Sequence, residues 1–293
     1  MIVGLNGQCI DDSQAVVSIY DHGFLYGIGL FETFRTYGGR AFLLDRHLDR
    51  MRQGLAELAI RFEPKVADVE RLIAQLLEAN ALADAYVRYT VTAGEDILGL
   101  PGNAYDRPTV VVYVKPLPAA SGASRSLQLL RLSRNTPESG IRLKSLHYMN
   151  NILGKRELLG YPWASGAEGL FLDGRGYLAE GLVSNVFFVS DGVLHTPDLG
   201  TGILPGVTRQ FVLELAQRLG LKTEEGFYRW EALREADEVF LTNSVQELVA
   251  VGTLFDGEGR HYPVGNGCAG PWTKRLREAY AQEAWRAGRA PGV

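Results

Sequence analysis

The feature that most constrains this 293-residue chain is a stretch of proline and small residues at positions 116–124. Its nine residues are two prolines, three alanines, two serines, one glycine and a single leucine. This composition is typical of a segment between domains, because it offers little apolar surface to a core. A chain of this length is also long for one core. We therefore predict a smaller N-terminal domain at 1–118, a linker at 119–124 and a larger C-terminal domain at 125–293.

The first domain has the pattern of a mixed α and β structure. Asn6-Gly7 predicts a tight hairpin, because both central positions of such a turn need positive φ. On the segment 85–93, Arg88, Thr90 and Thr92 share one face. Strands are predicted at 30–37, 85–93 and 109–115, and helices over about 45–58 and 66–80.

The second domain has strands with intervening helices. This succession predicts an α+β or α/β fold. Strands are predicted at 127–132, 168–172, 184–190, 238–241 and 248–251, and helices over about 147–159, 207–219 and 271–287.

Lys144 lies where a short extended segment gives way to the helix predicted over 147–159. A side chain at such a junction can face a cleft. The alternative is a solvated surface lysine, which is the more common case for a lysine taken alone. The apolar face of the helix is predicted to contain Met149, Ile152, Leu153 and Leu159.

Several other positions could bind an anion or balance a buried charge. Gly206-Val207-Thr208 opens a predicted helix, where unpaired backbone N–H groups favour an anion. Thr242-Asn243-Ser244 places further donors at a strand end, and Arg50 could bind a phosphate. Glu180 lies among apolar strand residues and either faces solvent or balances a buried cation. Taken singly, each also has an ordinary structural interpretation, such as a capped helix, a polar turn or a surface arginine.

The composition excludes several classes of function. A formal net charge of -4 with scattered Lys and Arg provides no basic stripe for nucleic acid or an anionic membrane. The two cysteines and five histidines are too dispersed for a disulfide framework or a zinc site, so no metal is expected. No apolar run approaches the roughly 20 residues of a spanning helix. The N-terminus lacks a signal-peptide pattern, and a cytoplasmic protein is expected.

Four ordered motifs resemble those of the class IV aminotransferases, also called fold type IV pyridoxal-phosphate enzymes. They are Arg-Leu-Lys-Ser-Leu-His-Tyr-Met-Asn-Asn at 142–151, Ala-Glu-Gly-x-x-Ser-Asn-Val-Phe at 179–187, Gly-Ile-Leu-Pro-Gly-Val-Thr-Arg at 202–209 and Thr-Asn-Ser at 242–244. Within the family, segments 20–35, 134–138 and 143–148 most resemble the bacillus-type 4-amino-4-deoxychorismate lyases. The resemblance implies a two-domain fold like that of D-amino acid aminotransferase, pyridoxal 5'-phosphate as cofactor, and a homodimer.

The resemblance also implies roles for individual residues. Lys144 would anchor the cofactor covalently and act as the catalytic base, and Glu180 would pair with the protonated ring nitrogen. Leu204 would pack against one face of the ring. The phosphate would be held by Arg50, Val207, Thr208, Asn243 and Ser244.

The chain departs from the D-amino acid aminotransferases of this family. They carry an arginine in a Val-Thr-Arg-Gly sequence that binds the substrate carboxylate, and this chain has Ala93 there. They also have a tyrosine at the position of Phe31 and a serine at that of Leu182. Arg88 is therefore our candidate for the carboxylate ligand, with a structural ion pair as the alternative. The candidate substrate residues are Phe31, Thr33, Arg88 and Tyr148.

Three functions remain to be distinguished. The first is a lyase of folate biosynthesis that eliminates pyruvate from 4-amino-4-deoxychorismate to give 4-aminobenzoate. Thr33, Tyr148 and Lys144 are then candidates for the acid that protonates the leaving group. The second is an aminotransferase acting on D- or branched-chain amino acids. The third is a non-enzymatic binding protein, which the joint presence of Lys144, Glu180, Arg50 and Thr208 disfavours.

Overall fold

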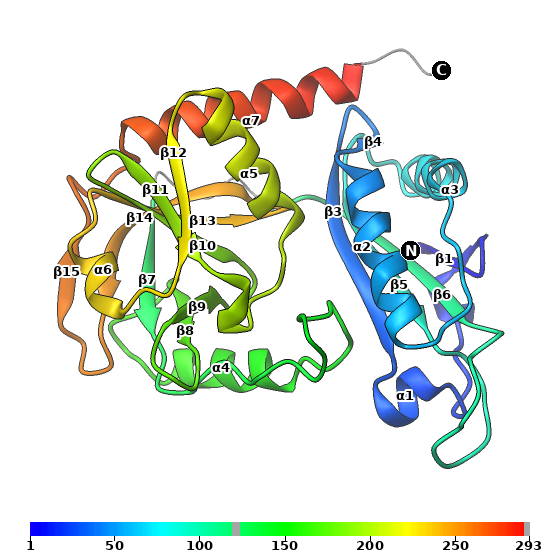
Figure 1. The fold of residues 1–293 in the computed structure, drawn as a ribbon. Helices are drawn as coiled ribbons and strands as arrows, with labels where there is room; N and C mark the ends of the chain where they lie inside the picture. The colour runs from blue at the N-terminus through cyan, green and yellow to red at the C-terminus, as the bar shows by residue number, and fades with distance from the viewer. Residues whose placement is uncertain (119–123, 290–293) are drawn as a thin grey trace. The chain divides into compact units, whose positions relative to one another are not determined.

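The computed structural model describes residues 1–118 and 124–289, which form two compact units (Figure 1). Unit 1 contains residues 1–118, Leu143–His147 and the described residues from Glu283 onward. Unit 2 contains the remainder, from residue 124. The predicted domains differ from these units at two places, because Leu143–His147 and the end of the last helix pack in unit 1. Residues 119–123 of the predicted linker lie outside the described residues.

Unit 1 is built on a six-stranded sheet in the order β2-β1-β6-β5-β3-β4. Every pairing in it is antiparallel. The predicted hairpin is confirmed, since Asn6 and Gly7 have φ values of 49° and 82° between the paired residues Leu5 and Gln8. The strands are β1 (Ile2–Leu5), β2 (Gln8–Asp11), β3 (Gly29–Tyr37), β4 (Arg40–Ala41), β5 (Tyr86–Thr92) and β6 (Thr109–Lys115), and the helices are α1 (His22–Tyr26), α2 (Leu44–Glu57) and α3 (Val66–Ala79).

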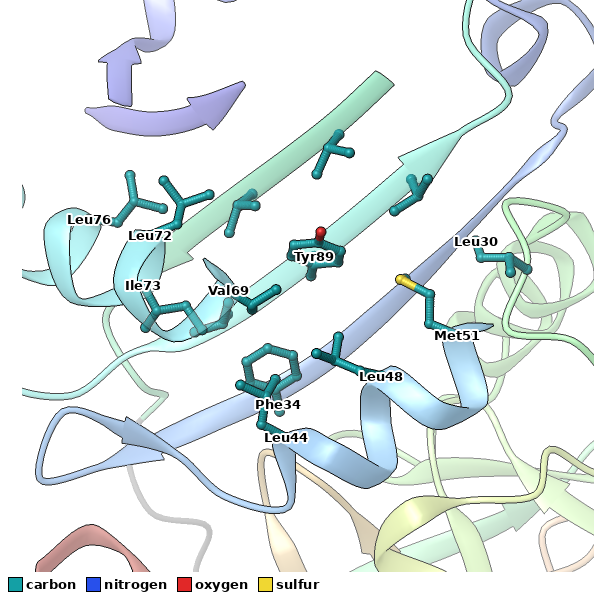
Figure 2. Close-up of a cluster of buried hydrophobic side chains, with 14 of the residues drawn as sticks. Leu30, Phe34, Leu44, Leu48, Met51, Val69, Leu72, Ile73, Leu76 and Tyr89 are labelled. Atoms are coloured by element: carbon teal, nitrogen blue, oxygen red, sulfur yellow. The ribbon is translucent and has the colours of Figure 1, made fainter. Parts of the chain in front are cut away.

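One face of this sheet packs against α2 and α3 and forms the core of unit 1 (Figure 2). Leu30 and Phe34 of β3 pack in one buried cluster with Leu48 and Met51 of α2. Tyr89 of β5 belongs to the same cluster. Because side chains alternate along a strand, the residues between these point to the opposite face of the sheet. That opposite face carries the candidate substrate residues of β3 and β5.

Unit 2 is built on a nine-stranded mixed sheet in the order β12-β11-β10-β13-β14-β7-β8-β9, with β15 beside β14. Because β9 also pairs with β10, six of these strands form a closed ring. The strands are β7 (Arg125–Leu129), β8 (Glu168–Leu172), β9 (Leu178–Gly181), β10 (Asn185–Ser190), β11 (Val193–Pro197), β12 (Lys222–Gly226), β13 (Glu238–Asn243), β14 (Glu247–Phe255) and β15 (His261–Pro263). The helices are α4 (Met149–Leu159), α5 (Val207–Arg218), α6 (Trp230–Arg234) and α7 (Pro271–Arg289), whose end belongs to unit 1.

The predicted apolar face of the helix over 147–159 is wrong. Helix α4 begins at Met149, and its buried residues are Asn151, Gly154 and Leu158. A Cβ at Gly154 would lie 2.6 Å from Cζ of Phe171, so only glycine allows this close approach to the sheet. Helical spacing identified one face, but the small and polar face is the one that packs. The exposed residues include Met149, Ile152, Leu153 and Leu159.

Each unit combines a β-sheet with helices, which confirms the mixed α and β fold class. Within residues 1–118 and 124–289, no helix is both long enough and apolar enough to span a membrane.

Candidate active site

Lys144 belongs to a segment that pairs with the edge of β3. Its carbonyl oxygen accepts a hydrogen bond from the Phe31 amide at 2.9 Å, and Ser145 forms an antiparallel bridge with Leu30. This register places Lys144 opposite Phe31. Leu143 packs against the core of unit 1 on the α2 side of the sheet. Alternation therefore directs the Lys144 side chain to the other face, where the side chain of Phe31 lies.

The Phe31 ring lies between two cations on that face. Nζ of Lys144 is 4.6 Å from the ring centroid, and the guanidinium carbon of Arg88 is 3.6 Å from it. The pairing of β3 with β5 places Thr33 directly opposite Arg88. Arg88 forms no ion pair with any residue that the structure describes, so the alternative of a structural ion pair is not supported. Its charge instead rests on an aromatic face, as in a cation–π contact.

Arg50 projects from α2 onto a buried carboxylate of β3. Its Nε donates to Oε1 of Glu32 at 2.8 Å, and its Nη2 donates to Oε2 at 2.6 Å. His47 lies one turn earlier on α2, and its Nδ1 is 2.7 Å from the same Oε2. Both Glu32 and His47 have only 1% of their side chains exposed. This fork is the bidentate geometry that fixes a guanidinium in one orientation.

The electrostatics of this group explain how a carboxylate can be buried. Burial raises the pKa of Glu32, but the charge of Arg50 and the hydrogen bond from His47 outweigh it and lower the pKa to about 2. Burial lowers the pKa of His47, so its ring is neutral at pH 7 and its Nδ1 must donate to the carboxylate. Sequence reasoning missed both partners of Arg50. The available signal was a glutamate at an inward position of a strand whose neighbours are apolar.

Glu180 occupies the point where β9 pairs with β10, opposite Asn185. Its Oε1 accepts from Nε of Arg134 at 2.8 Å. Its Oε2 accepts from the Leu204 amide at 2.9 Å, and Nδ2 of Asn185 lies 3.5 Å away. The carboxylate is buried and balances a cation, which supports the second of the two interpretations drawn from the sequence.

A second buried arginine lies close to the same carboxylate. Nε of Arg142 is 3.8 Å from Oε1 of Glu180, and that nitrogen donates to the carbonyl of Gly202. Burial, and next the charge of Arg134, lower the pKa of Arg142 to about 10. Sequence reasoning assigned no role to either arginine. Arg134 nevertheless lies in the segment 134–138 that carried part of the family resemblance.

The start of α5 has the form expected of an anion site. Gly206 precedes the helix with extended backbone, and no side chain caps the first turn. A Cβ at Gly206 would lie 2.1 Å from Oδ1 of Asn185, so this approach requires glycine. Oγ1 of Thr208 is 3.0 Å from Oγ of Ser244, which brings together two motifs that are 36 residues apart. The amide of Val207 and two hydroxyls are thus gathered at one helix N-terminus.

Asn243 uses its side chain within the adjacent turn. Its Oδ1 accepts from the amides of Val245 and Gln246 at 3.0 and 2.8 Å. Its Nδ2 donates to Oε1 of Gln246 at 3.1 Å. The side chain therefore shapes the loop that presents Ser244, and a direct role in phosphate binding stays a prediction.

The predicted residues fall into two groups, each within one unit. Tyr148 precedes the first residue of α4 and is half-buried. The functional roles of all these residues stay predictions. Unit 1 holds Phe31, Thr33, Arg50, Arg88 and Lys144, and unit 2 holds Tyr148, Glu180, Leu204, Val207, Thr208, Asn243 and Ser244.

Comparison with known proteins gives consistent matches over most of the chain. A model of the family described as amino-transferase class IV matches residues 29–254. Aminodeoxychorismate lyase of Bacillus subtilis (strain 168) is 43% identical over 251 residues, which are 85% of each chain. The crystal structure of 4-amino-4-deoxychorismate lyase from Pseudomonas aeruginosa has a TM-score of 0.81 and 30% identity, covering 96% of this chain and 98% of that one. A branched-chain amino acid aminotransferase of the source abbreviated T.th., complexed with N-(5'-phosphopyridoxyl)-L-glutamate, has a TM-score of 0.84 and 28% identity, covering 99% and 95%.

Glu32→Gln should reduce stability in a pH-dependent way. The folded pKa of Glu32 is about 2 against an ordinary value of 4.5, so its contribution is complete above about pH 4.5 and is lost as pH falls through about 2. We expect the substitution to lower the free energy of unfolding by about 3 kcal/mol at pH 7. Urea titrations of both proteins between pH 7 and pH 2 measure the difference.

The matched control is Glu63→Gln, which removes a carboxylate that pairs with Arg52 but is 69% exposed. That change should cost less than about 1 kcal/mol, because exposed ion pairs contribute little. A difference between wild type and Glu32→Gln that is equally large at pH 7 and pH 2 would contradict the assignment.

Proposed function

The chain belongs to the class IV aminotransferase family, and we propose that it is a 4-amino-4-deoxychorismate lyase. The substrate would lose pyruvate and become 4-aminobenzoate. The observation that carries this proposal is the 43% identity to the Bacillus subtilis aminodeoxychorismate lyase over 85% of both chains. The site supports it through Arg88, a cation beside Phe31 and Lys144 that has no carboxylate partner among the described residues and could take a substrate carboxylate.

Pyridoxal 5'-phosphate is the cofactor of this family, and the branched-chain relative described above was solved with a phosphopyridoxyl compound. The donors of this chain fit such a group. The bare backbone at Gly206 and the hydroxyls of Thr208 and Ser244 suit a phosphate. A buried carboxylate at Glu180 suits a protonated ring nitrogen, and Lys144 supplies an amine.

We assign the remaining contacts to the residues predicted from the sequence. Arg50, Val207, Thr208 and Ser244 would hold the phosphate, with Asn243 shaping the turn. Leu204 would pack against the ring, and its amide also orients Glu180. When bound, the cofactor withdraws electrons from the substrate carbon that carries the amine.

The chain's own residues account for the proton movements of the lyase reaction. Lys144 would remove the proton from C4 of the substrate as general base. The bond between C3 and the enolpyruvyl oxygen then breaks, and its electron pair leaves with that oxygen. A proton added at the methylene carbon completes pyruvate, and the ring becomes aromatic. Thr33, Tyr148 and the protonated Lys144 are the candidates for the donor of this proton.

An aminotransferase acting on D- or branched-chain amino acids is the second candidate function. The similarity to the branched-chain enzyme solved with a phosphopyridoxyl compound favours it. Lys144 would remove the same kind of proton but return it to the cofactor side, and the amino group would stay behind. Ala93 stands where the D-amino acid enzymes carry an arginine, which weighs against the D-specific version. Product analysis separates the two reactions.

We further propose that the chain acts as a homodimer on a small-molecule substrate. The family resemblance implies this, and the exposed face of α4 supports it. Met149, Ile152 and Leu153 expose between 42% and 71% of their surface in adjacent turns of that helix. Burial of such apolar side chains against a second copy would be favourable. Light scattering should give twice the mass of one chain.

Lys144→Ala should abolish turnover while the protein remains folded. We expect at least about a 10³-fold loss of kcat, because the substitution removes both the nucleophile and the general base. The assay measures 4-aminobenzoate and pyruvate from 4-amino-4-deoxychorismate, and the two products should form in equal amounts. Lys155→Ala, an exposed lysine of α4, is the control and should keep full activity.

Two outcomes would contradict these assignments. Full activity of Lys144→Ala would rule out the central role of that lysine. Accumulation of pyridoxamine phosphate with an amino donor, without 4-aminobenzoate from the chorismate substrate, would replace the lyase with an aminotransferase.

Arg88→Met should weaken substrate binding more than it slows the chemical steps. Loss of a charged hydrogen bond to a carboxylate should raise KM by about 10- to 100-fold, with a much smaller change in kcat. The control is Arg61→Met, because Arg61 is an exposed arginine that pairs with Asp106. An unchanged KM in Arg88→Met would show that another group binds the carboxylate.

A further inference from the structure

We infer that Arg134 is a positioning residue that keeps the Glu180 carboxylate directed at, and charged toward, the ring nitrogen of the cofactor. The inference rests on the proposed binding of pyridoxal phosphate by this chain, but not on whether the enzyme is a lyase or an aminotransferase. All of the residues that carry it lie within unit 2.

The first observation is a buried ion pair with defined geometry. Nε of Arg134 donates to Oε1 of Glu180 at 2.8 Å, and each of the two side chains is 6% exposed. On the other oxygen, the Leu204 amide donates at 2.9 Å. Each carboxylate oxygen therefore has a donor, and rotation of the group would break both hydrogen bonds.

The second observation is that Arg134 is itself held at its far end. Its Nη1 donates to Oδ1 of Asn150 at 2.7 Å and to Oδ1 of Asn135 at 3.0 Å. Asn151 is 3.4 Å from the same nitrogen, and its Nδ2 donates to the Leu182 carbonyl at 2.7 Å. The guanidinium thus connects Glu180 to the first turn of α4, the helix that follows the Lys144 segment.

The third observation separates the two arginines near Glu180. Arg142 directs its Nε at the Gly202 carbonyl and its two terminal nitrogens at Asn135. Its closest approach to the Glu180 carboxylate is 3.8 Å, outside hydrogen-bonding distance. Arg134 is therefore the arginine that bonds Glu180, while Arg142 adds a nearby positive charge.

Removing one partner of such a pair has a chemical consequence at the other. A buried carboxylate without its cation holds its charge poorly, because little solvent is available to stabilise it. A proton shared between that carboxylate and a ring nitrogen would then move toward the carboxylate. Arg134 would in this way determine where the proton lies without touching the cofactor.

The test uses purified enzyme loaded with pyridoxal phosphate that carries ¹⁵N in its ring. The ¹⁵N chemical shift distinguishes a protonated from a neutral ring nitrogen and does not depend on turnover. Wild type should show the protonated form, and Glu180→Gln should show the neutral one. Arg134→Met should move the resonance most of the way to the Glu180→Gln position, whereas Arg134→Lys, which keeps a cation, should stay closer to wild type.

A double-mutant cycle tests whether Arg134 acts through Glu180. Arg134→Met should change nothing further in the Glu180→Gln background, because the two residues then act as one unit. Arg175→Met is the control for loss of an arginine charge elsewhere in unit 2, since Arg175 pairs with Asp173, and its resonance should match wild type. Thermal unfolding of each apoprotein shows whether it is folded, and Arg134→Lys carries the test if Arg134→Met is not.

Each negative outcome has a distinct meaning. A wild-type protein that takes up no pyridoxal phosphate overturns the proposed function. A protein that binds the cofactor but gives the wild-type resonance in folded Arg134→Met overturns the inference about Arg134 alone. Equal shifts in Arg134→Met with and without Glu180 would also overturn it, because the arginine would then act by another route.

Discussion

The position of Lys144 depends on a short backbone pairing at the edge of β3. The Phe31 amide bonds the Lys144 carbonyl, and Leu30 bridges Ser145. A single backbone hydrogen bond contributes only about 1 kcal/mol net, so the pairing alone would be weak. Burial of Leu143 in the core of unit 1 supplies the additional stabilisation and determines which face Lys144 occupies. A shift of the segment by one residue would send Lys144 into that core.

Both units use an arginine to retain a buried glutamate. Glu32 is held by a fork from Arg50 with help from His47, and Glu180 is held by Arg134. A buried carboxylate is tolerated only when it is paired and hydrogen-bonded, because the loss of hydration is otherwise too costly. In the proposed function these two pairs support opposite ends of one cofactor: Arg50 at the phosphate and Glu180 at the ring nitrogen.

Local patterns predicted some features of the chain well and others poorly. The hairpin at Asn6-Gly7 and the start of α5 at Val207 were predicted because turn and helix-start chemistry depends on adjacent residues. The packing face of α4 was predicted wrongly. Helical periodicity assumes that the apolar face is buried, whereas Gly154 permits a closer contact with Phe171 than any larger residue could make.

The sequence by itself determined the family, through four ordered motifs, and the set of chemically able side chains from Lys144 to Ser244. It also determined that Arg88 shares a strand face with Thr90, because side chains alternate with a period of two. Only the tertiary structure decided which groups meet: Phe31 with Lys144 and Arg88, Glu32 with Arg50, and Glu180 with Arg134. The physical reason is that strand register and buried ion pairs join residues far apart in the chain. Their partners are selected by the free energy of the whole packed unit and not by any local pattern.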